Sequence, residues 1–296
     1  MNTDKIASTH LGKRSTGSEL YDPSLLVAIP RIENRKQYSI KNDDLPFYGE
    51  DVWHAYEFST LTQNGLPVTR LMKLKYACES EFLIESKSLK LYLNSFNMSK
   101  FGENTADCLK ICKKIIENDL SEKLQTEVSV NFLNNKTTKT LIFRDFENIM
   151  NYVNENSLKI EKFKEAPEVL EVQDFRKEEY YLTFDSLRSN CRVTHQPDFG
   201  DVFIYYKSKK YITEESLVKY LSSFRSEYHF HEECCEMIYK RLFDLLDKDD
   251  ELMVCALYTR RGGIDICPVR MSKNFKKDFT KHLLDVRILA RNGVKQ

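Results

Sequence analysis

The chain carries the same order of predicted segments twice, and this repeat constrains its fold more than any other feature. In the first half, residues 51–62 and 68–79 are rich in Val, Tyr, Phe and Thr and flank a turn with Gly and Pro, which predicts a β-hairpin. Apolar residues at helical spacing predict a helix over residues 105–123. Residues 126–133 alternate like a strand, and residues 139–146 give a weaker fourth strand.

The second half repeats this order. Strands are predicted over residues 179–190 and 201–208, helices over residues 213–224 and 232–246, and a last strand pair over residues 251–259 and 263–270. An Arg-Arg-Gly-Gly turn joins that last pair. We therefore expect an α+β fold made of two tandem ββααββ units, in which two antiparallel sheets are each covered by a helix pair.

Changes in composition along the chain predict five regions. We expect an N-terminal arm over residues 1–46, a first domain over 47–150, a charged connection over 151–175, a second domain over 176–275 and a basic C-terminal tail over 276–296. Short sheets leave edge strands that need a partner, so we also expect a homodimer.

Composition excludes several classes of partner. The 296 residues include 45 Lys and Arg and 45 Asp and Glu, so the chain lacks the general positive field of a nucleic-acid-binding protein. Residues 1–20 have no apolar core of a signal peptide, and no apolar run approaches the roughly 20 residues that cross a membrane. We expect a cytoplasmic protein with reduced cysteines, most of them ordinary core residues.

The densest chemical signal is SNCRVTHQPDFGDV, residues 189–202. A cysteine attacks only as the thiolate, which at its ordinary pKa of about 8.5 is a minor species at neutral pH. Arg192 beside Cys191, and Asp198 as a proton acceptor after Pro197, would meet that need. The alternative is a buried structural cysteine followed by an ordinary turn.

A second signal is FRSEYHFHEECCE, residues 224–236. At helical spacing His229 and His231 point in nearly opposite directions, so we expect only one of them to face a site. Glu232 has the chemistry to bind the two-donor edge of a purine. Two alternatives remain: a zinc site that uses His231 with the neighbouring Cys234 and Cys235, and a solvated helix start.

Two further segments have the residue types of phosphate sites. Residues 84–97, IESKSLKLYLNSFN, combine serines and charges after a strand, and residues 258–268, YTRRGGIDICP, combine two arginines with two glycines. A solvated charged face and a bare hairpin turn explain them equally well. The sequence has no Walker loop and no Gly-x-Gly-x-x-Gly after a strand, which disfavours an ATPase or a Rossmann dehydrogenase.

Together these segments carry a family pattern. They occur in the order LPFYGEDVWHAYE, ESKSLKLYLNSFN, SNCRVTHQPDFG, SFRSEYHFHE and YTRRGGIDICP. In this pattern the chain resembles the long, two-domain form of 7-cyano-7-deazaguanine reductase, the NADPH-dependent nitrile reductase of queuosine biosynthesis. The resemblance implies a tunnelling fold in each half, a homodimer, and reduction of a nucleobase nitrile to 7-aminomethyl-7-deazaguanine.

The resemblance also implies roles for single residues. Cys191 matches the nucleophile that forms a covalent thioimide with the nitrile, and Asp198 matches the proton donor and acceptor. The implied substrate contacts are Ile84, Glu85, Ser86, His231 and Glu232, and the implied NADPH contacts are Ser86, Lys87, Arg261 and Gly262. No metal is implied.

The chain departs from the family pattern at a few places. It has Cys267-Pro268-Val269-Arg270 where the family often has Asn-Pro-Trp-Arg, and Cys235 adds a second thiol beside Cys234. Two other functions fit the same architecture. One is a zinc-dependent pterin cyclohydrolase, which bound zinc would favour, and the other is a non-catalytic purine-binding module, which would never form a covalent adduct.

Overall fold

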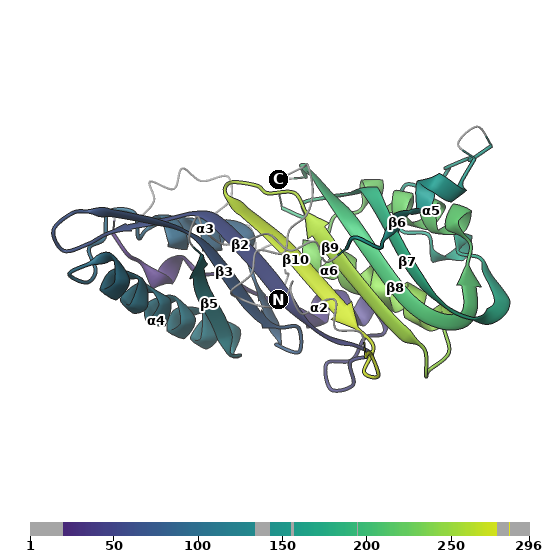
Figure 1. The fold of residues 1–296 in the computed structure, drawn as a ribbon, viewed down its shortest axis with the longest axis horizontal. Coiled ribbons are helices and arrows are strands. Elements are labelled where there is room, and N and C mark those ends of the chain that lie inside the picture. Colours follow the sequence, from purple (N-terminus) through teal and green to yellow (C-terminus); the bar gives the residue numbers. More distant parts are fainter. Residues whose placement is uncertain (1–19, 134–142, 155–156, 194, 277–283, 285–296) are drawn as a thin grey trace.

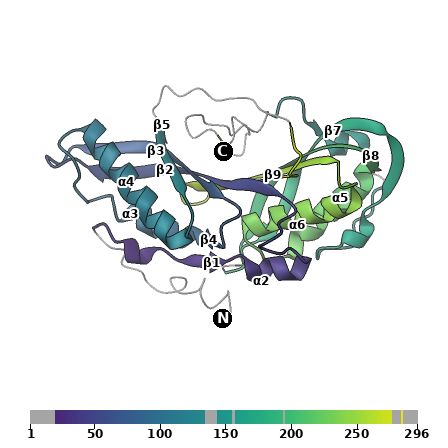
Figure 2. The same ribbon diagram turned by 90° about the horizontal axis from the view of Figure 1, so that it is seen from below.

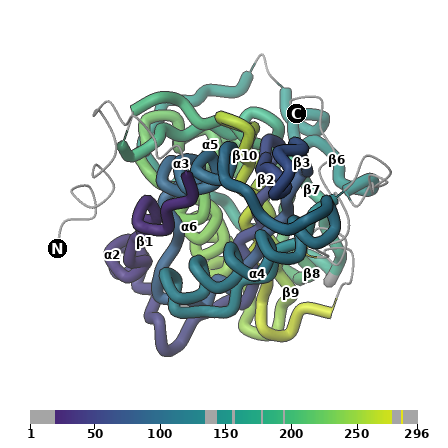
Figure 3. Tube along the Cα trace, turned by 90° about the vertical axis from the view of Figure 1, so that its left-hand side faces the viewer, coloured from purple at the N-terminus to yellow at the C-terminus, as the bar shows by residue number. Residues whose placement is uncertain are grey.

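The computed structural model describes residues 20–133, 143–154, 157–193, 195–276 and 284. Its fold is mixed α+β, as expected. One sheet of eight strands runs through the molecule in the order β5-β3-β2-β10-β9-β8-β7-β6, with helices at both ends of it (Figure 1). Figure 3 looks along the long axis from the first unit, with α4 nearest the viewer.

The first unit contains a hairpin and two helices. Its elements are β2 (Tyr48–Leu61), β3 (Pro67–Ala77), β4 (Phe82–Ile84), α3 (Ser86–Asn94), α4 (Thr105–Leu124) and β5 (Val128–Leu133). Helix α4 confirms the helix predicted over residues 105–123. It buries Cys108, Cys112, Ile116, Leu120 and Leu124, which recur every four residues and so form one apolar face.

The second unit has the order strand, strand, helix, helix, strand, strand. Its elements are β7 (Val172–Asn190), β8 (Pro197–Ile212), α5 (Glu214–Ser222), α6 (His231–Leu245), β9 (Glu251–Tyr258) and β10 (Ile264–Met271). In Figure 2 the helices of both units lie on the same side of the strands. Each helix pair covers one half of the sheet, and an apolar core lies beneath each pair.

The expectation of two separate sheets is wrong. Strands β2 and β10 pair along the whole of β10, from Ile264 opposite Ala55 to Met271 opposite Tyr48, so the two halves share one sheet. Pairing satisfies the backbone groups that each half would otherwise expose at its inner edge. The weaker fourth strand predicted over residues 139–146 is described only in part: residues 143–146 form no strand, and residues 139–142 lie outside the described part.

The N-terminal arm joins the two units on the helix side of the sheet. It contains η1 (Pro23–Leu25), β1 (Ala28–Pro30), α2 (Ile32–Arg35) and η2 (Lys36–Tyr38). Strand β1 pairs with β4 of the first unit, whereas Tyr38 packs into the core of the second. The arm therefore ties the start of α3 to the second unit.

Residues between the units pack with the second one. Strand β6 (Glu147–Asn148) pairs with β7, and η3 (Ile149–Tyr152) buries Ile149 in the second core. A short turn, η4 (Pro167–Val169), follows. The described part of the chain contains no helix with the length and apolar character needed to span a bilayer. The homodimer stays a prediction.

Candidate active site

A cavity lies where the two units meet. It is partly open to solvent, and its space, with the solvent-open part included, amounts to about 850 Å³. Nine of the ten residues expected at a site line it, from both halves of the chain: Ile84, Ser86, Lys87, Cys191, Asp198, His231, Glu232, Arg261 and Gly262. The β2–β10 seam and the arm bring these distant segments together.

Cys191 lies on a tight turn at the cavity wall. Strand β7 ends at Asn190 and β8 begins at Pro197, so the turn is closed by a hydrogen bond from the Cys191 amide to the Gln196 carbonyl, at 2.8 Å. His195 in this turn has a φ of 57°. Cys191 is partly exposed, whereas the other seven cysteines are buried. Burial also raises the pKa of the Cys234 thiol to about 12. Because Cys191 is the partly exposed thiol, it is the one that a ligand can reach.

Asp198 is almost fully buried and is held from two sides. One Asp198 oxygen accepts a hydrogen bond from Arg261 Nη1 at 2.5 Å, and the other lies 3.3 Å from His231 Nε2. Arg261 also donates to the Pro197 carbonyl, at 2.9 Å. The His231 ring stacks on Tyr258 with centroids 3.8 Å apart. The carboxylate and the imidazole are therefore fixed in orientation and able to exchange a proton.

Glu232 presents an unsatisfied carboxylate to the cavity. The residue is 1% exposed, and no donor among the described residues bonds to its Oε1 atom. Burial raises the pKa of Glu232 to about 8, and the negative charge of Asp51 adds to that effect. Because an unpaired buried acceptor is costly, a ligand with N–H donors would bind here favourably.

The tenth residue expected at the site is Glu85. Its side chain is the N-cap of α3 and accepts from the amides of Lys87 and Ser88, at 3.1 and 2.6 Å. It is buried and does not line the cavity. Its charge stabilises the positive end of the helix in this structure, and its role as a substrate contact stays a prediction.

Both histidines of the second signal line the cavity, so the expectation that only one faces it is also wrong. Helix α6 begins at His231, which leaves His229 in extended chain where helical spacing does not apply. His229 lies between two carboxylates, 3.0 Å from Glu227 and 3.5 Å from Glu233. Arg192, expected to act on Cys191, contacts Glu233 at 3.1 Å.

Other lining residues had no role in the expected site. They are Trp53, Lys90, Gln196, His229, Phe230, Thr259, Ile264 and Ile266. Lys90 was within reach of sequence reasoning, because it follows Ser86 by four residues and so shares its helical face. Trp53 was not, because only the pairing of β2 with β10 places it at this wall.

Cations at the cavity suit an anionic cofactor. Lys87, Lys90 and Arg261 all line it, next to the N-terminal end of α3. Gly262 has a φ of 54°, a left-handed backbone conformation that glycine adopts without strain. This donor set fits the phosphates of a dinucleotide.

The zinc alternative finds no support at this cavity. Cys235 Sγ lies within hydrogen-bonding distance of the Val254 and Pro268 carbonyls inside the protein. Within the described ranges, one group of metal-type side chains lies close together: His54, Asp265 and Cys267, all buried. It does not line the cavity, and the Asp265 carboxylate is bonded there by His54 Nδ1 at 2.7 Å.

Comparison with known proteins agrees with this geometry. Residues 18–132 match the family described as "Nitrile reductase, 7-cyano-7-deazaguanine-reductase N-term", and residues 197–277 match "QueF-like protein". A relative from Colwellia psychrerythraea is 37% identical over 95% of this chain and 98% of its own length. Relatives from Rickettsia bellii and Buchnera aphidicola are each 38% identical, over 94% and 87% of this chain and 98% and 95% of their own lengths.

All three relatives carry the name NADPH-dependent 7-cyano-7-deazaguanine reductase, an oxidoreductase that acts on a nitrile. The likeness extends over nearly the whole chain and includes both walls of the cavity, which confirms the resemblance found in the sequence. The chain belongs to the 7-cyano-7-deazaguanine nitrile reductase family.

Proposed function

We propose that the chain reduces the nitrile of 7-cyano-7-deazaguanine to an aminomethyl group through a covalent thioimide on Cys191, as a step of queuosine biosynthesis. One observation carries the proposal: the reachable thiol, the fixed Asp198–His231 pair and the unsatisfied Glu232 carboxylate line a single cavity. A thiol, a proton carrier and a base-recognising acceptor are the groups that such a reaction needs.

The covalent step balances without any further reactant. Asp198 accepts the proton of the Cys191 thiol, and the sulfur then forms a bond to the nitrile carbon. One π bond of the nitrile breaks, and its electron pair moves to nitrogen, which takes the proton back from Asp198. The whole substrate is added and nothing is expelled. Arg261 and His231 stabilise Asp198 while it exchanges the proton.

Reduction of the thioimide to the amine needs two hydrides and two protons. NADPH bound in this cavity would supply the hydrides, with Lys87 and Lys90 holding its phosphates. The residues of the chain orient the base through Glu232 and deliver protons through Asp198. Walls from both units limit the access of water, which protects an imine from hydrolysis.

Intact-mass spectrometry tests the covalent step. Protein mixed with the nitrile and no NADPH should gain one adduct per chain, with the mass of the whole substrate. Cys191→Ala should abolish the adduct and turnover, whereas Cys234→Ala should keep the adduct because that thiol is buried. Asp198→Asn should slow capture. An adduct that survives Cys191→Ala would exclude the mechanism.

Steady-state kinetics test the cofactor contacts. Lys87→Ala and Lys90→Ala should each raise the KM for NADPH, and both variants should keep covalent capture of the nitrile, which needs no cofactor. Lys110→Ala, at an exposed position on α4, is the matched control and should leave this KM unchanged. If either variant loses adduct formation but keeps its KM for NADPH, the assignment of that lysine to the cofactor site is wrong.

A further inference from the structure

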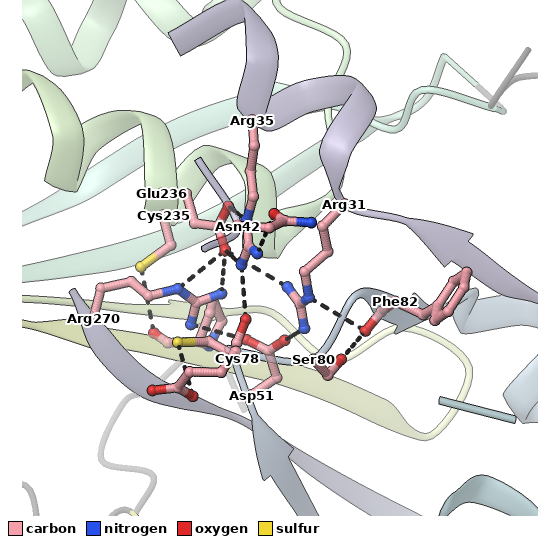
Figure 4. Close-up of polar contacts among 12 residues, drawn as sticks. Arg31, Arg35, Asn42, Asp51, Cys78, Ser80, Phe82, Cys235, Glu236 and Arg270 are labelled. Carbon is pink, nitrogen blue, oxygen red and sulfur yellow. Dashed lines mark hydrogen bonds and ion pairs between the residues drawn. The ribbon is translucent and has the colours of Figure 1, made fainter. Parts of the chain in front are cut away.

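Five charged side chains form a buried cluster next to the cavity (Figure 4). The charge cluster consists of Arg31, Arg35, Asp51, Glu236 and Arg270, each at most 2% exposed. Arg270 lies 2.9 Å from Asp51 and 3.0 Å from Glu236, and Arg35 lies 2.9 Å from Glu236. Arg31 bonds to Asp51 and lies 3.6 Å from Glu236.

The two strands of the seam connect the charge cluster to the cavity. On β2, Asp51 belongs to the cluster, and Trp53, two residues later on the same sheet face, lines the cavity. On β10, Arg270 belongs to the cluster, and Ile266, four residues earlier on the same face, lines the cavity. The cluster therefore lies directly beside this part of the cavity wall, on the same two strands.

The helix and the arm make the same connection. On α6, Glu236 belongs to the cluster, and Glu232, one turn earlier on the same face, lines the cavity. Arg31 Nε donates to the Phe82 carbonyl at 3.2 Å, and Ile84 two residues later lines the cavity. On each of four elements, β2, β10, α6 and β4, a residue of the cluster or its hydrogen-bond partner lies two to four residues from a residue of the cavity wall.

The charges of the cluster do not cancel. Three guanidinium groups against two carboxylates leave one positive charge in a buried region. Ionised Glu232 would supply the missing negative charge. Its pKa reports the same neighbours: burial and Asp51 raise it, whereas Arg31 and Arg270 lower it. Glu232 therefore behaves as a sixth member of the cluster, and the only one that faces the cavity among those described.

This charge count covers the buried cluster and Glu232, and other titratable groups also lie around Glu232. Tyr76 on β3 stays uncharged, because burial raises its pKa well above the usual value. His231 beside Glu232 points its Nε2 atom at Asp198. The cations Lys87 and Arg261 line the cavity from α3 and from the β9–β10 turn, and Arg261 is already paired with Asp198.

We propose that Arg31, Asp51 and Arg270 are positioning residues for substrate recognition, because the net positive charge of the cluster favours the ionised form of Glu232, which accepts from the two N–H donors of the base. This inference rests on the proposed role of Glu232 in binding the base. It makes the N-terminal arm, through Arg31, part of the specificity of the site.

The pH dependence of base binding tests the inference. In a Cys191→Ala background, where no adduct forms, calorimetry would measure the Kd for 7-cyano-7-deazaguanine between pH 6 and 9. The affinity for the base should rise with pH as Glu232 ionises, and the midpoint of this rise should report the pKa of Glu232. Asp51→Asn, which adds one net positive charge, should move that midpoint down by about one pH unit, and Arg31→Met should move it up by about as much.

The double variant Arg31→Met/Asp51→Asn restores the original net charge, so its midpoint should return to that of the parent. If the two residues had a purely structural role, each substitution would weaken base binding, and the two losses of affinity would add in the double variant. Lys240→Met removes a charge from the solvent side of the same helix, where Lys240 contacts Asp244. This control should not move the midpoint. Urea unfolding would show that each variant is folded. If Arg31→Met does not fold, the shift of the midpoint in Asp51→Asn alone is enough to test the inference.

Two results separate failure of the inference from failure of the proposed function. If Glu232→Gln weakens base binding but Asp51→Asn leaves the midpoint unchanged, the cluster has no role in recognition and the inference is wrong. If Glu232→Gln leaves the affinity unchanged at every pH, the proposed role of Glu232 is wrong as well.

Discussion

The two ends of the β2–β10 seam treat buried polar groups in opposite ways. At the charge cluster, each carboxylate faces guanidinium groups within 3.0 Å. At the cavity, Glu232 Oε1, His231 Nδ1 and Trp53 Nε1 are buried without a hydrogen-bond partner among the described residues. Removing one partner of a paired buried charge is costly because it leaves the other charge uncompensated, whereas an unpaired group costs stability until a ligand satisfies it. The same strands therefore carry structure at one end and recognition at the other.

The largest expected effect compares the two glutamates of α6. Glu236→Gln leaves Arg35 and Arg270 without their shared anion, so the free energy of unfolding should fall by about 3–5 kcal/mol. Glu232→Gln, one turn away, should change it by less than about 1 kcal/mol at pH 7, because no ion pair is lost. Urea unfolding at pH 7 measures both. Equal losses would show that the two ends do not differ.

The same glutamates should give opposite pH dependence of stability. Burial alone would raise the pKa of Glu236, but Arg270 and Arg35 outweigh it and hold that pKa at about 2. Since this folded pKa lies below the unfolded one, the stability from Glu236 is present above about pH 4.5 and is lost as the pH falls towards 2, by about 3 kcal/mol.

For Glu232 the sign is reversed. Its folded pKa of about 8 lies above the ordinary value of 4.5, so stability is lost as the pH rises from about 4.5 through 8. Urea unfolding from pH 5 to 9 should show this decline in the wild type and a flatter profile in Glu232→Gln. An unchanged decline in the variant would assign it to another group.

A smaller effect separates the thiols of the two ends. Cys235 is fully buried beside the charge cluster, so Cys235→Ala should lower the free energy of unfolding by about 1–2 kcal/mol through the space it leaves. Cys191→Ala at the cavity should change it by less than about 0.5 kcal/mol. Thermal unfolding compares the two, and a larger loss from Cys191→Ala would contradict the assignment of structure and function to opposite ends.

The smallest effect concerns Glu85. Glu85→Gln weakens the cap of α3 and should cost about 1 kcal/mol of stability, with little change in the Kd for the base. Glu81→Gln at a nearby exposed position is the control and should have no effect. A large loss of base affinity without a loss of stability would show that Glu85 contacts the substrate.

Local patterns were enough to predict part of this molecule. The spacing of Cys112, Ile116 and Leu120 predicted α4, and the predicted site segment around Cys191 lies in the wall of the cavity. The seam was not predictable, because edge pairing of β2 with β10 depends on backbone groups that every residue has. The charge cluster was missed for a similar reason, since Arg35 and Glu236 lie 201 residues apart with no local signal.

The long span of the seam has a consequence for synthesis of the protein. His54 on β2 meets Asp265 on β10 across 211 residues, so the first unit leaves the ribosome long before its partner strand exists. During that interval the edge of β2 is open to pairing with other chains. The nascent first unit therefore exposes an unpaired strand edge until β10 emerges, and a chain that stops before Ile264 should aggregate rather than accumulate as a soluble domain.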